Sequence, residues 1–198
     1  MEKSEVKICS KKLSSEEFKV FVNSIKATYR IFCFNKIGHE IIGKEPFRKP
    51  WEDFMDIWNY ILVNSRFYYL VNVVKIFDPE FDTKTNKSNI SFCRVVPGYK
   101  DKLTKQNLET IRNVRSMRNE ILVHPSAEAL LENKYCEENY GLDPMGIKIE
   151  SLFKKIFELL NEKKGDYQYS EDINQEKEKE NIQKRFKEWY KIFEEKYV

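Results

Sequence analysis

Three residues with complementary chemistry lie within seven positions of one another, from Arg118 to His124. Arg118 is always charged, Asn119 supplies an amide, and His124 is one of only two histidines in the chain. A fixed cation can bind a phosphate group, and an imidazole that titrates near neutrality can transfer protons. Together these three side chains have the chemistry that cleavage of a phosphodiester requires.

The segment around Arg118 has the apolar periodicity of a helix. At about 100° per residue its apolar side chains fall on one face, which is roughly 140° wide, with Arg118 near the middle. This face consists of Leu103, Ile111, Val114, Met117, Ile121 and Leu122. An arginine among apolar neighbours needs a partner, because removing a charge from water is costly. Arg118 therefore either binds a ligand or pairs with a carboxylate of another helix, such as Asp56.

His124 precedes Pro125, and a residue before proline is disfavoured in a helix, so we expect the helix to end at His124. The imidazole could then turn toward Arg118, at a helix end whose dipole favours its protonated form. The alternative is that His124 only caps the helix. Arg112 and Arg115 lie on an adjacent polar strip. They are either a solvated surface or a rim that contacts RNA phosphates.

The composition indicates an all-helical protein of one domain. Of 198 residues, 41% are hydrophobic and 34% charged, and there are only six glycines and six prolines. The net charge of +3 is too small to indicate nucleic-acid binding by itself. The four cysteines (Cys9, Cys33, Cys93 and Cys136) show no metal-binding spacing, so we expect reduced thiols, no metal and no cofactor. Without an apolar leader or a membrane-spanning stretch, the expected location is cytoplasmic.

Helical spacing and capping signals predict five long helices. The first runs from Ser14, where Glu17 completes a capping box, to Ile42 before Gly43. The second is expected from Pro50 or Trp51 to 78, and the third from Asp101 or Thr104 to Val123. The fourth is expected over 143–165 and the fifth from Ser170 or Asp172 onward, with a short helix after Ser126. His39, in the last turns of the first helix, is interpreted as a surface or packing residue. The long apolar helix over 50–78 is expected to be central and to touch more than one neighbour.

The remaining long connection, residues 79–100, shows no helical period. Residues 89–96 are expected to be extended, and the connection is either an insertion or a substrate lid. The sequence predicts a flexible lead over 1–13, a bundle over 14–165 and a charged helix over 166–198 that packs on it. The predicted fold is thus an all-α, mostly antiparallel bundle of four to five long helices.

The stretch R-N-E-I-L-V-H (118–124) fits the pattern R-x4–6-H and lies late in a long predicted helix of such a bundle. In this respect the chain resembles the HEPN superfamily, in particular its abortive-infection-associated branch. The resemblance implies a metal-independent endoribonuclease of a toxin or antiphage system that acts as a homodimer with a composite site. It also implies proton transfer by His124, phosphate binding by Arg118 and positioning by Asn119. A cognate antitoxin, such as a small nucleotidyltransferase, is a possible partner.

The chain departs from one branch of the superfamily, in which a tyrosine stands two residues after the histidine. Here that position is Ser126, so regulation by nucleotidylation of that tyrosine does not carry over. The alternative to an enzyme is a non-catalytic HEPN-like bundle that binds RNA or nucleotides, or serves as a protein-interaction module. An intact Arg–Asn–His set favours the enzyme, and the weakly basic composition favours the binding module.

Overall fold

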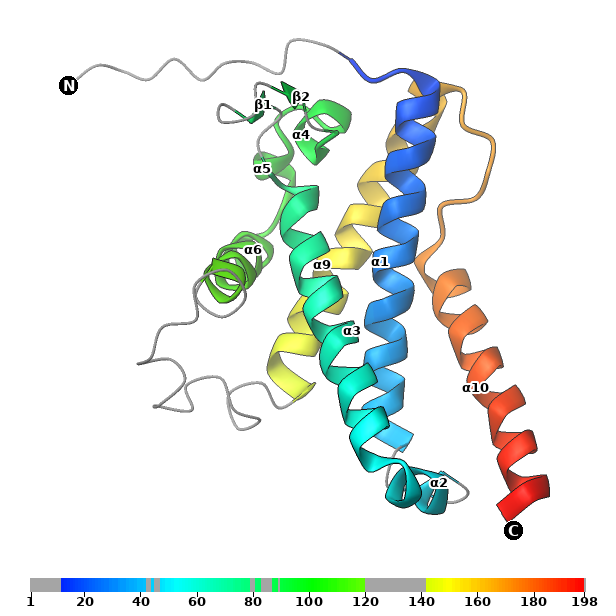
Figure 1. Cartoon of the computed structure of the whole chain (residues 1–198). Helices are drawn as coiled ribbons and strands as arrows, with labels where there is room; N and C mark the ends of the chain where they lie inside the picture. The colour runs from blue at the N-terminus through cyan, green and yellow to red at the C-terminus, as the bar shows by residue number, and fades with distance from the viewer. Residues whose placement is uncertain are drawn as a thin grey trace.

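Helices account for nearly all regular structure in the computed structural model, which describes residues 12–41, 44, 47–78, 81–82, 87–88, 90–119 and 142–197. Four of the described helices have 22 or more residues: α1 (Ser15–Ile41), α3 (Met55–Ile76), α9 (Leu142–Lys163) and α10 (Gln175–Tyr197). Figure 1 shows α3 and α9 running opposite to α1, with α10 on the far side of α1 from α3. The predicted all-α helical bundle is confirmed.

The first helix begins as its capping signals predict. The backbone N–H of Ser14 donates to the Glu17 carboxylate (2.7 Å), and the backbone N–H of Glu17 donates to Ser14 Oγ (3.1 Å). This reciprocal pair satisfies N–H groups that have no partner inside the helix. Leu13 and Phe18, on either side of the cap, are both buried. The capping box is confirmed.

The prediction of one continuous helix up to residue 78 is wrong, because the helix is interrupted at Phe54. A short helix, α2 (Arg48–Asp53), ends there and α3 begins at Met55. Phe54 has φ −127° and ψ 31°, outside the helical region, although it is neither glycine nor proline and Pro50, four residues earlier, lies within α2. The contacts of Phe47 with the rings of Tyr190 and Phe193 of α10 give a tertiary reason, since they set the direction of α2 independently of α3.

Residues 90–102 are also more ordered than their sequence predicts. Two-residue strands β1 (Phe81–Asp82) and β2 (Lys87–Ser88) pair antiparallel, and short helices α4 (Phe92–Val95) and α5 (Tyr99–Lys102) follow. The expectation that 89–96 is extended is therefore wrong over 92–95. Phe92 is fully buried and packs edge-to-face on Phe77 (5.4 Å), so burial against α3 decides this conformation. With such burial, this part of the connection belongs to the core and is not a substrate lid.

The third predicted helix is α6 (Lys105–Met117), which starts where Thr104 Oγ1 accepts from the backbone N–H of Asn107. The fourth ends at Lys163 and continues as a 3-10 turn, η2 (Lys164–Tyr167). The last begins five residues after Ser170, at Gln175, with the Asn174 side chain accepting from the N–H of Glu176. Residues 1–11 of the lead predicted over 1–13, and the short helix predicted after Ser126, lie outside the described residues.

The core lies where α1 meets α3, α9 and α10. The buried side of α1 includes Phe18, Val22, Ile25 and Tyr29, all 0% exposed, and α9 contributes an apolar stripe. The stripe consists of Ile149, Leu152, Phe153, Ile156, Phe157 and Leu160. Tyr29 packs against Phe153 and Phe157 with ring centroids 5.0 and 5.4 Å apart. None of the helices in the described part of the chain has the length and apolarity that a membrane span needs.

Glu150 of α9 joins three helices through one partly buried carboxylate. Its oxygens accept from Lys36 Nζ of α1 (2.7 Å) and from Lys179 Nζ of α10 (3.0 Å). Burial raises the pKa of this carboxyl, but the hydrogen bonds and charges of the two lysines outweigh that effect, and the net pKa lies below its usual 4.5. A lowered pKa means that the carboxylate stabilises the folded state above pH 4.5 and loses this effect as the pH falls through the folded pKa.

We expect Glu150→Gln to lower the free energy of unfolding by about 1–2 kcal/mol at neutral pH, because charge-assisted hydrogen bonds are lost. The difference from the wild type should shrink below pH 4.5, where the wild-type carboxylate also takes up its proton. Urea denaturation across this pH range measures both effects. Glu158→Gln on the same helix is the matched control, since Glu158 forms an exposed pair with Lys155. A Glu150 variant with the control's pH dependence would contradict the assignment.

Candidate functional site around Arg118

Arg118 directly follows the last residue of α6, at the rim of the core. Its Nη1 lies 3.6 Å from Asp78 Oδ2, at the end of α3, and its Nε donates to Asn119 Oδ1 (3.1 Å). The Arg118 side chain is 23% exposed and that of Asp78 is 29% exposed. The guanidinium is therefore held between two helix ends but remains in contact with solvent.

Two expectations about Arg118 need correction. Ile111, Val114 and Met117 are buried as the helical wheel predicts, but Arg118 on the same face is only partly buried, with 23% of its side chain exposed. Its carboxylate partner is Asp78, not Asp56. Asp56 stands 22 residues earlier on α3, which is about 33 Å along a helix, so the two acids mark opposite ends of α3. Helical periodicity places a residue on a face but does not say where the neighbouring helix ends.

The two other arginines of α6 differ in their surroundings. Arg115 is partly buried, and its Nη2 donates to the backbone carbonyl of Phe77 (3.2 Å). A guanidinium is favoured there, because carbonyls at a helix C-terminus lack helical partners and carry the negative end of the dipole. Arg112 is exposed to solvent, and so is Asn119. Of the two arginines predicted to contact RNA phosphates, Arg115 is engaged by the Phe77 carbonyl, whereas Arg112 is exposed to solvent.

The structure brings Arg118, Asn119 and Arg115 together at the end of α3, whereas His124 lies outside the described residues. Sequence reasoning missed Asp78 as a site residue, since it was only the last residue of the helix predicted to end at position 78. The available signal was an acidic residue at the end of a helix packed against α6, but pairing it with Arg118 requires knowledge of which helix ends meet. The other histidine, His39 of α1, lies 3.4 Å from Arg66 Nη2 of α3.

The chemistry available at this place is anion binding by a guanidinium. A guanidinium has five N–H donors in one plane, and those of Arg118 are only partly used by Asn119 and Asp78. A phosphate would compete with the Asp78 carboxylate for the same charge, and a bidentate pair with phosphate is the stronger of the two. Among the residues that the structure describes, no cluster of His, Cys, Asp and Glu could hold a metal ion.

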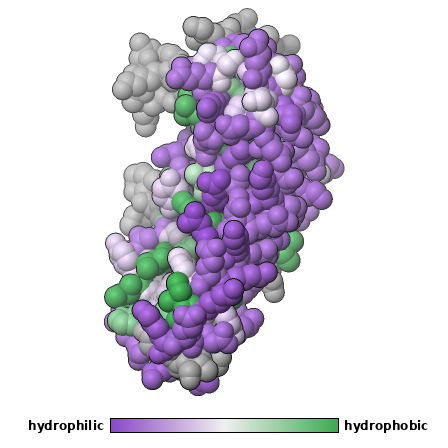
Figure 2. Space-filling view, turned by 90° about the vertical axis from the view of Figure 1, so that its right-hand side faces the viewer, coloured by the Kyte–Doolittle hydropathy of each residue, from purple (hydrophilic) through white to green (hydrophobic). Residues whose placement is uncertain are grey.

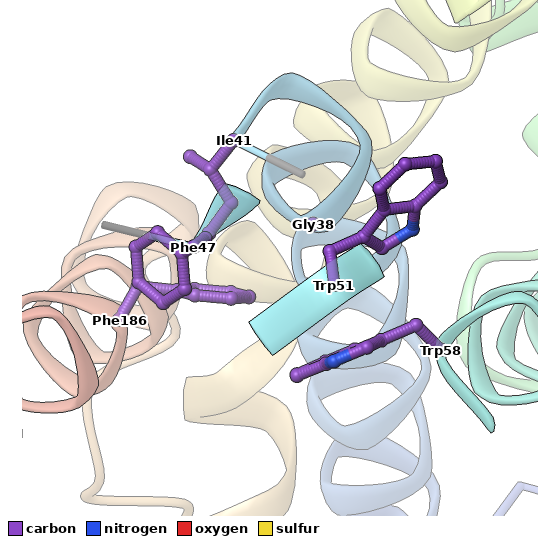
Figure 3. Close-up of a pocket in the computed structure, with 6 residues that line it drawn as sticks. All are labelled: Gly38, Ile41, Phe47, Trp51, Trp58 and Phe186. Carbon is purple, nitrogen blue, oxygen red and sulfur yellow. The ribbon is translucent and has the colours of Figure 1, made fainter. Parts of the chain in front are cut away.

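Hollows also lie elsewhere in the part of the bundle that the structure describes. Figure 3 shows a small apolar pocket with the indoles of Trp51 and Trp58 on one side of Gly38 and the rings of Phe47 and Phe186 on the other. Its volume of about 20 Å³ is enough for about one water molecule, so it cannot hold a substrate. A Cβ at Gly38 would lie 2.8 Å from Leu62 Cδ2, so a larger residue there would require the Leu62 side chain to shift.

The second hollow is an open groove of about 940 Å³ between α1 and α10. Arg30, Lys184 and Arg185 supply its positive charges, and Trp189 lies at its edge. Figure 1 places α10 and α6 on opposite sides of α1 and α3, so the groove is not continuous with the surroundings of Arg118. The cations of the groove therefore cannot complete a site with Arg118 in the same chain.

The rim around Arg118 thus remains the candidate site, formed by Arg118 and Asn119 with Asp78 as the resting partner of the guanidinium. Its geometry suits an anion, and the residue that would add proton transfer is His124. Comparison of the chain with protein-family models, with curated proteins and with solved structures found no match.

Proposed function

We propose that this chain is a metal-independent endoribonuclease of the HEPN type, acting as a toxin or antiphage effector. The observation that carries the proposal is the position of Arg118. It is a partly exposed guanidinium at the end of α6 in an all-α bundle, beside Asn119 and six positions before His124. A guanidinium that is held by a weak ion pair at the surface is available to a phosphate.

The reaction would be an in-line attack by the ribose 2′-hydroxyl on the adjacent phosphorus. His124 takes the 2′-hydroxyl proton or protonates the leaving 5′-oxygen, and Arg118 stabilises the charge that develops on the phosphoryl oxygens. The new bond joins the 2′-oxygen to phosphorus and the bond to the 5′-oxygen breaks. The products are a 2′,3′-cyclic phosphate and a 5′-hydroxyl, and no metal takes part. A homodimer would bring two such sets into one composite site.

A second candidate function follows from the ion pairs themselves. Arg118 pairs with Asp78, and Arg115 binds a carbonyl of α3, so both arginines also fasten α6 to α3. A bundle in which this is their whole role would be a non-catalytic RNA-binding, nucleotide-binding or protein-interaction module. A cognate antitoxin, such as a small nucleotidyltransferase, is expected as a partner only if the chain is the ribonuclease toxin.

The deciding experiment is an RNA-cleavage assay in EDTA with tRNA and mixed-sequence RNA, followed by analysis of the product ends. We expect the wild type to cleave under chelation and to leave 2′,3′-cyclic phosphates, and His124→Ala to be inactive. His39→Ala is the matched control, because it removes the only other histidine and should keep the activity. Cleavage that needs a metal, or that survives in His124→Ala, contradicts the proposal. Binding of RNA without any cleavage favours the second function.

A further inference from the structure

The open groove between α1 and α10 takes no part in the proposed function. Its volume of about 940 Å³ lies within the range of ligand sites, which measure about 300–1,000 Å³. Both helices are described along the whole groove. The charged and aromatic residues of its walls are Arg30 and Phe34 of α1 and Lys184, Arg185, Glu188 and Trp189 of α10. The groove thus combines charges with aromatic rings.

Both helices carry an excess of positive charge along the groove. Between positions 18 and 39, α1 has four basic residues and no acidic one. Between positions 181 and 191, α10 has four basic residues and a single acidic one, Glu188. Acids and bases alternate only before this stretch, in E-K-E-K-E (176–180). The whole chain has a net charge of only +3, so the excess is local to these two segments.

Two cations of the groove are available to a ligand. Lys184 and Arg185 are exposed, and neither forms an ion pair or hydrogen bond with a described residue. Arg30, by contrast, pairs with the carboxylate of Glu178, which is buried. An anion that enters the groove therefore meets two cations that have no such partner and one carboxylate, that of Glu188, which lowers the net positive charge without cancelling it.

Aromatic rings adjoin these cations. Trp189 is 38% exposed, and its ring contacts that of Phe34 edge-to-face, with 6.2 Å between the centroids. Phe34 in turn stacks on the buried ring of Phe186 (5.5 Å), which holds it in place. Trp189 follows Arg185 by four residues, or about one helical turn, so the two side chains project from the same side of α10. A flat ligand can stack on the indole while the guanidinium binds its charge.

Single-stranded nucleic acid has the chemistry that this groove matches. Each of its units supplies one negative charge and one flat ring, and unpaired bases stack on aromatic side chains while the phosphates contact bases such as lysine and arginine. A duplex hides the faces of its bases, and an acidic peptide carries charges without a ring for each. Figure 2 looks onto the side where Figure 1 places α10, and the largely hydrophilic surface there is unsuited to insertion into lipid.

We propose that the groove between α1 and α10 binds single-stranded RNA, with Lys184 and Arg185 on the phosphates and Trp189 against a base. From Asn181 to Trp189 the groove follows α10 for eight residues, about 12 Å, which is the length of about three stacked nucleotides. The groove lies on the other side of α1 and α3 from Arg118, so it would hold a different part of the RNA. Binding there needs no catalysis, and the inference therefore goes beyond the proposed function.

Fluorescence anisotropy of the full chain with a labelled, 2′-O-methylated uridine dodecamer tests the groove. The methyl groups block attack by the 2′-oxygen, so binding is measured without cleavage. We expect Arg185→Glu to weaken binding by about tenfold or more. Lys187→Glu is the matched control, because Lys187 lies outside the groove and about 200° around α10 from Arg185, and it should weaken binding by less than about threefold. Equal weakening by both variants, or a wild type that does not bind, overturns the proposal.

A gain of affinity covers the case in which a variant does not fold. Glu188→Gln removes the carboxylate of the groove and should tighten binding by about twofold, which a misfolded protein would not do. Glu180→Gln is the control, since Glu180 is also exposed on α10 but lies outside the groove, and its affinity should stay that of the wild type. Weaker or unchanged binding by Glu188→Gln contradicts the proposal.

A third pair of variants separates stacking from charge. Trp189→Leu keeps an apolar side chain against Phe34 but removes the indole, and should weaken RNA binding by about tenfold. Tyr190→Leu is the control, because Tyr190 is similarly exposed (40%) but contacts Phe47 and does not line the groove. RNA binding that is unchanged in Trp189→Leu, or polyglutamate bound as tightly as the RNA, shows a general anion site and overturns the proposal. A chain that binds this RNA but cleaves none contradicts the ribonuclease proposal alone.

Discussion

Arg118→Ala should slow RNA cleavage by about 10³-fold, because in the proposed mechanism it removes the cation that stabilises developing charge on the phosphoryl group. The bundle should remain folded. At 23% and 29% exposure, the Arg118–Asp78 pair is partly screened by solvent and contributes only about 0.2–1 kcal/mol. Single-turnover cleavage in EDTA measures the rate, and urea denaturation measures the stability. Wild-type cleavage by this variant would remove Arg118 from the mechanism.

Asp78→Ala is the matched variant, since it abolishes the same ion pair but keeps the guanidinium. We expect it to cleave within about tenfold of the wild-type rate, because a substrate phosphate replaces the carboxylate as the partner of Arg118. Arg118→Lys keeps a charge without the planar fork and should resemble Arg118→Ala in rate. If Asp78→Ala and Arg118→Ala lost activity equally, the pair would support cleavage only by holding α6 on α3, and Arg118 would have no direct role at the phosphate.

Ile156→Ala should lower the free energy of unfolding by about 2–5 kcal/mol, a large part of the total stability of a domain of this size. Ile156 is 0% exposed in the apolar stripe of α9, so the lost methyl groups leave a cavity against the neighbouring helices. Ile147→Ala on the same helix is the matched control. Ile147 is 57% exposed, and its replacement should change stability by no more than about 0.5 kcal/mol.

Both isoleucine variants gain the same helix propensity from alanine, so their difference reports burial alone. If the unfolding free energy of each variant falls with urea concentration at the wild-type slope, both proteins still unfold as the wild type does. Equal losses at positions 147 and 156 would mean that α9 does not present one face to the core, in conflict with the packing of Tyr29 against Phe153 and Phe157.

Local signals in the sequence determined where most helices begin and which of their residues share a face. Ser14 with Glu17 and Thr104 with Asn107 are capping pairs only three residues apart, so the sequence itself contains both partners. The apolar stripe of α9 and the burial of Ile111, Val114 and Met117 follow from spacings of three and four residues, which are properties of an isolated helix. The Arg118–Asn119–His124 set was likewise visible because its members are neighbours in the chain.

Contacts between distant segments were decided only by the tertiary structure. The helix breaks at Phe54, where the nearby Phe47 rests on rings of α10, and Phe92 adopts a helical turn, where it is buried against α3; neither follows from neighbouring residues. The partner of Arg118 is Asp78, 40 positions earlier, and the apolar start of α3 is exposed although its composition matches its buried end. Periodicity identifies an apolar face, but which helix covers it, and over what length, depends on where the elements meet in space.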